Sequence, residues 1–581
     1  MRKFIFAFTL ACLLMPAALE ARKAATVINV IPYPQSVEIG KGTFKGSGAT
    51  FNCDPAIDAR SISVIRDFAD KITFITGRTN SFATPPGLAK IAQEGKMKGF
   101  IFLKDGNMGP EEYSIAISKK NCIVSASAYN GFLYAIQTLK QLTDVKIFSE
   151  EIDPAQKFLF PCVTIKDKPR FAYRGMHLDC ARHFFSVEEV KKYLDIMATY
   201  KLNRFHWHLT EDQGWRIEIA KYPKLTQIGA FRNGTMVGKD FNSNDGIRYG
   251  GYYTKEQMKD IVKYAEDLGI TIIPEIDLPG HMVAALAAYP ELGCTGGPYE
   301  VWTRWGVADD VLCVGKEETF TFLQDVLTEM MDIFPSEYIH IGGDECPKIR
   351  WQECPRCQAR IKELGLKGHG DITAEQELQC YVTARIQKFL NEHGRKIIGW
   401  DEILEGDLAE GATVMSWRGT QGGIEAAKRG FDVIMTPNSH MYIDYYQSQE
   451  RDKEPLCIGG LVTVPKIYSY EPYEGMAPGT EDHILGVQAN LWTEYVTSPE
   501  FLEYMLLPRL CALSEVQWCN ADRKDYSRFD ASLDHTFQML DVMGYTYAKH
   551  VRGIIGLPGY EQPARSEEEL AKYLEENPIG W

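Results

Sequence analysis

The chain has 581 residues, of which 45% are hydrophobic and 24% are charged. These are ordinary globular values, so the composition excludes a disordered, collagen-like or fibrous chain. The formal net charge is −15 and no long basic run occurs, which argues against a nucleic-acid-binding surface. Length alone would allow about four domains, although single α/β barrels of ~250 residues or more are common.

The first 21 residues have the pattern of a secretory signal peptide. Arg2 and Lys3 form a basic start, residues 4–14 are apolar but too few for a membrane span, and Ala21 offers a cleavage site. We therefore expect an exported protein, periplasmic or secreted, with no membrane span. Lipid anchoring at Cys12 is the less favoured alternative, because the residues before it fit a lipoprotein signal poorly.

The chain has 14 cysteines, and an odd number remains if Cys12 leaves with the signal peptide. Some should form disulfides outside the cytoplasm, with at least one left over. Cys354 and Cys357 form a CxxC motif close to Cys346. A single CxxC without a second pair or a histidine at ligand spacing is weak evidence for zinc, so structural thiols or a local disulfide are favoured.

Residues 22–165 alternate short strands and helices, and we expect a small α+β domain here. Helices are predicted over 61–76 and 131–142, and strands over 113–117 and 122–126, from their apolar spacing. No group of chemically reactive residues stands out in this part of the chain.

From residue 166 to about 520 the pattern changes to repeated strand–helix units, which is typical of a (β/α)8 barrel. The fold class is therefore α/β, with a (β/α)8 TIM barrel after the small α+β domain. Residues 521–581 are expected to form a helix and tail on the outside. The predicted barrel strands are 173–178, 204–209, 271–276, 338–341, 396–400, 413–417, 432–435 and 484–491. The predicted helices are 187–200, 255–268, 317–333, 374–392, 424–428 and 499–514, and a helix between the last two strands is unclear.

The carboxyl ends of these strands, where barrel enzymes place their sites, are rich in carboxylates and tryptophans. Carboxylates accept hydrogen bonds from hydroxyls, and an indole covers the C–H face of a pyranose. One tryptophan at a strand end is more often core than ligand platform, but Trp400, Trp417 and Trp492 would share one rim. The rim therefore favours a sugar site.

At the end of the fourth strand, His340-Ile341-Gly342-Gly343-Asp344-Glu345 resembles the signature of the β-N-acetylhexosaminidases, glycoside hydrolase family 20. The resemblance extends in order over about 27–520. Supporting matches lie at 131–142, 178–185, 206–209, 212–216, 274–281, 399–400 and 491–494.

This resemblance implies an exo-acting, retaining, substrate-assisted mechanism, an exception to the usual pair of catalytic carboxylates. The 2-acetamido carbonyl of a terminal β-linked GlcNAc or GalNAc would attack its own anomeric carbon and form an oxazolinium. Glu345 would be the general acid and then the base, and Asp344 would orient the acetamido group. Neighbouring strand residues point to opposite faces, so the chain must bend after Gly343 for both to reach one sugar.

The resemblance also implies roles for other residues. Arg182, Asp444 and Glu494 would bind sugar hydroxyls, and the indoles and a tyrosine would hold the acetamido group. Glu211 stands where many relatives have Asp, and with His281 it would form a network supporting the catalytic acid. A disulfide between Cys294 and Cys313 is implied as well. The substrate-binding set is thus Arg182, Trp400, Trp417, Tyr442, Asp444, Trp492 and Glu494.

Parts of the sequence are compatible with two other functions. His206 and His208 could place two imidazoles on one face for a metal-dependent amidohydrolase, but the fifth and sixth strands end in tryptophans instead of ligands, so we expect no metal and no other cofactor. A sugar-binding protein without activity should lack Asp344 or Glu345, and both are present. The expected partner is an oligosaccharide or glycoconjugate substrate of unspecified source, not a nucleic acid.

Overall fold

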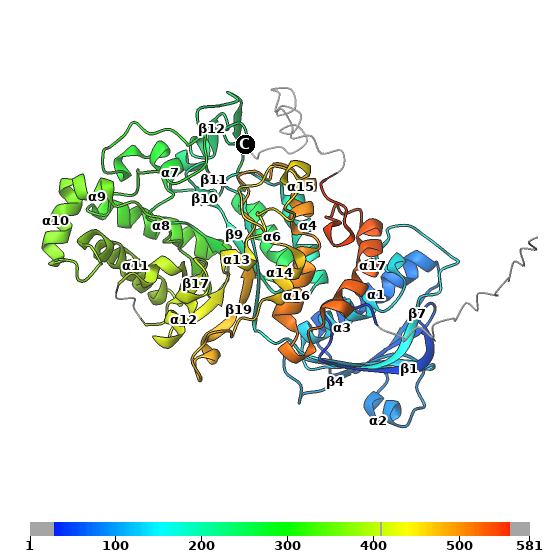
Figure 1. Ribbon diagram of the computed structural model, residues 1–581. Helices are drawn as coiled ribbons and strands as arrows, with labels where there is room; N and C mark the ends of the chain where they lie inside the picture. Colours follow the sequence, from blue (N-terminus) through cyan, green and yellow to red (C-terminus); the bar gives the residue numbers. More distant parts are fainter. Residues whose placement is uncertain (1–27, 407–409, 558–581) are drawn as a thin grey trace, which may run out of the picture.

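The computed structural model describes residues 28–406 and 410–557 (Figure 1). Its first part is a seven-stranded sheet in the order β1-β7-β5-β6-β4-β2-β3. The strands are β1 (Ser36–Lys45), β2 (Thr50–Cys53), β3 (Ser81–Ala83), β4 (Gly99–Lys104), β5 (Tyr113–Ile117), β6 (Asn121–Ala126) and β7 (Leu159–Asp167).

Two helices cover the face of this sheet that looks toward the rest of the molecule, α1 (Ala59–Thr76) and α3 (Tyr129–Gln141) (Figure 1). A phenylalanine-rich core joins them to the sheet, while the short α2 (Leu88–Gln93) packs separately against Ile101. The predicted helices and strands of this part are present, with ends shifted by at most two residues.

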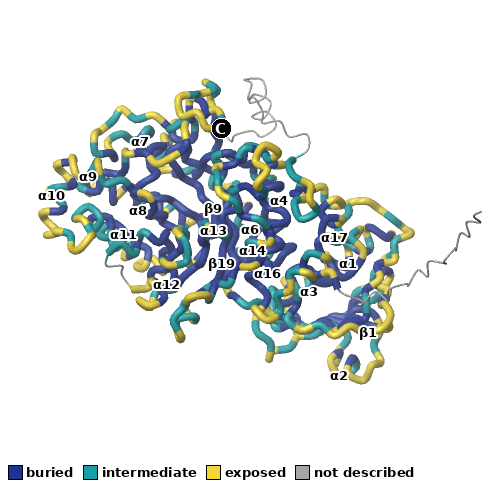
Figure 2. The backbone as a smooth tube through the Cα atoms, viewed as in Figure 1, coloured by how far each residue is buried: buried dark blue, intermediate teal, exposed yellow. Residues whose placement is uncertain are grey.

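The second part is a closed barrel of eight parallel strands, which confirms the predicted α/β fold. The strands are β8 (Tyr173–Asp179), β9 (Arg204–His208), β14 (Thr271–Glu275), β15 (Tyr338–His340), β16 (Lys396–Trp400), β17 (Thr413–Ser416), β18 (Asp432–Met435) and β19 (Ile484–Ala489). The last strand, β19, pairs with the first, β8, through Gly486 and Tyr173. Figure 2 shows the barrel strands buried at the centre and exposure concentrated on the surrounding helices and loops.

Helices surround the barrel, and several begin where the sequence offers a cap. Ser186 and Glu189 form a capping box at α4 (Val187–Thr199), and Thr254 with Gln257 does so at α6 (Lys255–Asp267). The other covering helices are α8 (Glu317–Ile333), α11 (Ala374–Glu392), α12 (Gln421–Lys428), α14 (Val464–Ser469) and α16 (Arg509–Trp518). The short α14 lies between the last two strands, β18 and β19, where the presence of a helix was unclear from the sequence.

The prediction of a single helix over 499–514 is wrong. The segment is divided into α15 (Pro499–Leu506) and α16, with Leu507 in an extended conformation. Pro508 has no backbone N–H and cannot continue the helical hydrogen bonding. The predicted final helix is present as α17 (Tyr526–Met543), which packs into the barrel's outer core and contacts α3 through His535.

Other expectations fall partly outside the described residues. The signal peptide with Cys12 and the tail beyond residue 557 lie there. In the described ranges, no helix is long and apolar enough to cross a membrane. The implied disulfide is wrong, because Cys294 and Cys313 both carry free thiols, as do the other cysteines of the described part.

Candidate active site

Asp344 and Glu345 lie on the loop that follows β15, at the carboxyl end of the barrel. The predicted bend is present, since Gly342 and Gly343 have φ angles of +64° and +100°. A Cβ atom on Gly342 would lie 1.8 Å from Oδ1 of Asp277, so only glycine fits there. Glu345 itself has φ +45°, a strained conformation for a non-glycine residue of the kind that gathers at functional sites.

The bend turns both carboxyl groups toward one imidazole. Nε2 of His281 lies 3.7 Å from Oε2 of Glu345 and 3.9 Å from Oδ2 of Asp344. The Glu345 side chain is 44% exposed and that of Asp344 only 13%. Interaction with His281 lowers the pKa of Glu345, whereas burial raises the pKa of Asp344. Two adjacent carboxyls thus differ in acid strength because of their surroundings.

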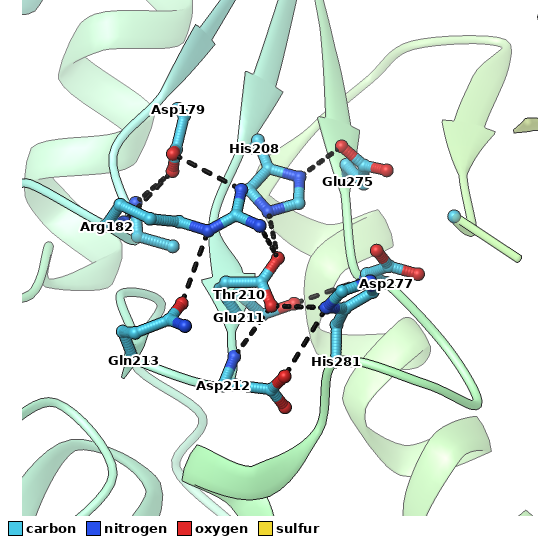
Figure 3. Close-up of polar contacts among 12 residues, drawn as sticks. Asp179, Arg182, His208, Thr210, Glu211, Asp212, Gln213, Glu275, Asp277 and His281 are labelled. Carbon is cyan, nitrogen blue, oxygen red and sulfur yellow. Dashed lines mark hydrogen bonds and ion pairs between the residues drawn. The ribbon is translucent and has the colours of Figure 1, made fainter. Parts of the chain in front are cut away.

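A network of ion pairs fixes the position of His281 (Figure 3). Its Nδ1 lies 2.6 Å from Oε1 of Glu211, whose other oxygen lies 2.9 Å from Nη2 of Arg182. Burial alone would lower the pKa of His281, but Glu211 and Asp212 raise it well above its usual value. The two oxygens of Glu211 therefore reach both the imidazole and the guanidinium.

Beneath this network, Glu275 on β14 gathers three histidines inside the barrel. Carboxylate oxygens of Glu275 lie 2.9 Å from nitrogens of His206 and His340, and a third contact is made by His208. Trp400 Nε1 donates to Glu275 over 3.0 Å. The histidines hold the pKa of Glu275 well below its usual value even though burial opposes this. The hydrogen bond to Glu275 therefore fixes the position of the Trp400 indole.

This arrangement agrees with the hydrogen-bonded interpretation of His206 and His208. Glu275 and His340 were missed as their partners, although cross-strand register places Glu275 opposite His208 and His340. His206, Glu275 and His340 bring ligand atoms within 4.8 Å of one another and could hold an ion. However, Glu275 already accepts a hydrogen bond from Trp400 and contacts three imidazoles.

The predicted aromatic residues form a continuous wall along the rim. Trp417 and Tyr442 stack with ring centroids 6.1 Å apart, and Trp492 lies 6.5 Å from Tyr442 and 5.9 Å from Trp400. The Arg182 guanidinium lies 5.0 Å from the centroid of Trp492. Residues at or after the ends of separate barrel strands are therefore brought together. An aromatic wall with a charged end suits a pyranose ring.

Acceptors for hydroxyl groups lie beyond this wall. Burial, followed by the charge of Glu494, raises the pKa of Asp444 well above its usual value, and burial also raises that of Glu494. Arg182 opposes both shifts. Its Nε donates to Gln213 over 3.2 Å and its Nη1 lies 3.4 Å from Asp179. These groups can accept from, and donate to, neighbouring sugar hydroxyls.

Two further carboxyls lie at the site, and the sequence indicated no individual role for either of them. Burial and Asp344 raise the pKa of Asp277 well above its usual value, and Asp277 also accepts a hydrogen bond from the Gly343 N–H over 3.2 Å. Burial and Asp344 likewise raise the pKa of Glu402 to about 8, and Glu402 accepts a hydrogen bond from Trp417 over 3.0 Å. Asp277 directly follows a predicted strand and Glu402 is the second residue after another, which was the available signal.

Residues 171–521 match the family model described as the catalytic domain of glycosyl hydrolase family 20, and residues 27–168 match domain 2 of the same family. The chain belongs to glycoside hydrolase family 20. It is a glycoside hydrolase of the β-N-acetylhexosaminidase type, as its curated relatives also indicate.

Family 20 relatives match over nearly the whole chain. A β-hexosaminidase of Porphyromonas gingivalis is 41% identical over 98% of this chain and 70% of its own length. A β-N-acetylhexosaminidase of Cellulomonas fimi is 32% identical over 92% of this chain and 98% of its own. The Streptomyces plicatus N-acetyl-β-hexosaminidase, solved with Thio-NAglucal, has a TM-score of 0.76 and 30% identity over 90% of this chain and 96% of its own. A Vibrio harveyi exo-β-N-acetylglucosaminidase, solved with N-acetylglucosamine, has a TM-score of 0.75 at 30% identity, covering 90% of this chain and 78% of that one.

Proposed function

We propose that the protein removes terminal, non-reducing β-linked GlcNAc or GalNAc from glycans, with retention of configuration and through an oxazolinium intermediate. The observation that carries this proposal is the pair Asp344 and Glu345, both turned toward His281 beside a continuous aromatic wall. The Vibrio harveyi and Streptomyces plicatus relatives, both solved with GlcNAc, support the choice of substrate.

In the first step the acetamido oxygen forms a bond to the anomeric carbon while the glycosidic C–O bond breaks. Glu345 delivers its proton to the departing oxygen. Asp344 accepts a hydrogen bond from the acetamido N–H and stabilises the positive charge that develops there. Tyr442 donates a hydrogen bond to the acetamido oxygen. Trp400, Trp417 and Trp492 enclose the group, and such positioning can supply ~7–11 kcal/mol of the barrier in well-oriented reactions.

In the second step Glu345 takes a proton from water, and the water oxygen attacks the anomeric carbon. The oxazolinium ring opens, the acetamido group is restored and the sugar leaves with its original configuration. His281 interacts with Glu345 and Asp344 and supports the change of protonation. Arg182, Asp444 and Glu494 hold the hydroxyls at the far end of the sugar. Neither step needs a metal or another cofactor.

The test compares aryl β-glycosides of GlcNAc, GalNAc and glucose that carry the same leaving group. We expect turnover of the GlcNAc and GalNAc glycosides. We expect no comparable turnover of the glucoside, because its 2-hydroxyl provides no internal nucleophile. Comparable rates on the glucoside would contradict the mechanism. So would a covalent glycosyl adduct on either carboxylate in a mass spectrum of the trapped enzyme, because that adduct belongs to the two-carboxylate route.

We also propose that the enzyme acts outside the cytoplasm, on the basis of residues 1–21. Fractionation of cells that express the full chain tests this proposal, since recovery of the uncleaved protein in the cytoplasm would contradict it.

A further inference from the structure

Four cysteines from separate parts of the chain meet at one point on the barrel periphery. We call Cys294, Cys313, Cys354 and Cys357 the four-cysteine cluster. Their sulfur atoms all lie within 4.8 Å of one another, and each carries a free thiol. The cluster is well shielded, because Cys313, Cys354 and Cys357 are buried and Cys294 is half-buried.

The distances between the sulfur atoms match those of a tetrahedral metal site. Sγ of Cys313 lies 3.7 Å from that of Cys354 and 3.8 Å from that of Cys357, which in turn lies 3.9 Å from Cys294. Four thiolates about 2.3 Å from a tetrahedral zinc ion are about 3.8 Å apart from one another. A disulfide needs about 2.05 Å and joins only two sulfurs, whereas here Cys313 is almost equidistant from two.

The backbone is built to bring the four sulfurs together. An isolated β-bridge between Gly293 and Leu312 sets Cys294 beside Cys313. The CxxC pair lies at the beginning of α10 (Pro355–Leu364), and this turn packs tightly on Gly315. A Cβ atom on Gly315 would lie 2.3 Å from the carbonyl carbon of Arg356, so the close approach requires glycine.

The surroundings of the cluster include two cationic side chains. Arg356 Nη2 donates to the carbonyl of Cys294 over 3.2 Å, and Lys316 Nζ donates to the carbonyl of Gly293 over 3.1 Å. Two cations thus lie at the edge of a site whose four thiolates and one divalent ion would together be an anion. Groups that surround the ligands of a metal site commonly orient those ligands and adjust the properties of the metal.

We propose that the four-cysteine cluster is a structural zinc site. Four thiols bind one Zn²⁺ and release four protons, so the charge balances and no oxidant is needed. All four positions of the tetrahedron are filled by protein, which leaves none for a water or a sugar. The site is therefore separate from the proposed hydrolysis.

The position of the cluster indicates which segments the metal would hold together. Cys294 and Cys313 lie on the segment between β14 and α8, and Cys354 and Cys357 lie on the segment between β15 and α11. The second segment begins with the bend that carries Asp344 and Glu345. An ion pair between Asp310 and Arg350, 2.7 Å apart, joins the same two segments. Zinc would therefore fasten the catalytic loop to its neighbour.

The first experiment measures metal content by inductively coupled plasma mass spectrometry on the full chain, purified without chelator. We expect about one zinc ion per chain, because a structural site of four cysteines binds a single ion. The test variant is Cys354→Ser with Cys357→Ser, and Cys380→Ser, outside the cluster, is the control. Zinc should be lost from the double variant, with a lower Tm, and retained in the control.

Three outcomes would overturn the proposal. These are a metal-free native protein, an intact mass showing disulfides among the four cysteines, and zinc retained in the double variant. If the double variant fails to fold, the native chain is refolded with cobalt alone. The absorption bands of tetrahedral cobalt bound by thiolates would support the site, and their absence would overturn it.

Discussion

At the scale of single residues, Glu345 and Asp344 differ in how far water reaches them. Glu345 is the more exposed and has the lowered pKa, so the free protein holds it as a carboxylate at neutral pH. Bound sugar would remove water from around it and raise that pKa, which favours the protonated form needed for the first step.

We predict that Glu345→Gln lowers turnover of a natural disaccharide by ~10²–10⁴-fold, the usual effect of losing a general acid–base group. An aryl glycoside with a good leaving group should lose less in the first step, since its departure needs little protonation. Steady-state and pre-steady-state rates on both substrates check this. Glu353→Gln, an exposed change on the same segment, is the control. A wild-type rate on the disaccharide would show that another group is the acid.

A second prediction concerns pH. Interaction with His281 lowers the pKa of Glu345, so replacing His281 should raise that pKa and keep the acid form to higher pH. The alkaline limb of kcat/KM is then expected to move upward in pH for His281→Asn. Asparagine is chosen because His281 has φ +50°, a conformation that asparagine tolerates well.

The matched control is His369→Asn, since this exposed histidine pairs with Glu377 away from the site. Its pH profile should coincide with that of the native enzyme. If His281→Asn leaves the alkaline limb in place, His281 does not set the acidity of Glu345, although a lower rate would still be consistent with a positioning role.

Residues that touch the proposed sugar site were identified from motifs in the sequence, because a motif keeps the catalytic pair and the tryptophans at recognisable positions. Glu275, Asp277 and Glu402 were given no individual role, because their importance depends on which side chains lie across the barrel. The four-cysteine cluster was missed for the same reason. One CxxC looked isolated because its partners lie far away in the sequence, and the implied pair Cys294 and Cys313 suggested a disulfide.

At the scale of elements, the loop after β15 depends on one glycine. Gly342→Ala would place a methyl group against Asp277 and force the loop to shift. We predict a loss of activity of ~10²-fold or more, as is seen when reacting groups are misplaced by about 1 Å. Activity and Tm are both measured.

Gly365→Ala is the matched control for this change, because Gly365 has φ +68° but open space around its Cβ position. It should cost about 1–3 kcal/mol of backbone strain without loss of turnover. Equal activity in the two variants would mean that the clash with Asp277 does not govern the loop.

The strands and most helices could be predicted because each is a short apolar run bounded by caps and turns. The break between α15 and α16 was missed because the apolar spacing continues through Leu507 and Pro508. Proline interrupts backbone hydrogen bonds without interrupting the pattern of burial, and both helices are buried almost throughout.

At the scale of the whole molecule, a buried ion pair joins the two domains. Lys201 Nζ lies 2.8 Å from the hydroxyl of Tyr113 and 3.4 Å from Asp167, and it lies 4.5 Å from the ring centroid of Trp518. We predict that Lys201→Met destabilises the protein by ~3–5 kcal/mol, because Asp167 is left buried without its cation. The midpoint of urea unfolding measures this.

Lys191→Met serves as the comparison, since Lys191 pairs with Asp260 in a more exposed position and should contribute ~1 kcal/mol or less. Activity of the folded Lys201→Met protein should stay close to that of the native enzyme. Similar midpoints for the two variants would show that the domains do not depend on this pair.

The closure of the barrel has a consequence for how the protein is made. The seam between β8 and β19 is bridged by Gln517, whose amide donates to the carbonyls of Gly175 over 2.9 Å and Val487 over 2.8 Å. A ribosome delivers β8 long before these partners, so one edge of β8 stays unpaired for most of synthesis. Unpaired edges invite wrong pairing. A nascent chain halted before Ile484 should therefore be cut by protease near residues 171–179, a stretch that the finished protein protects.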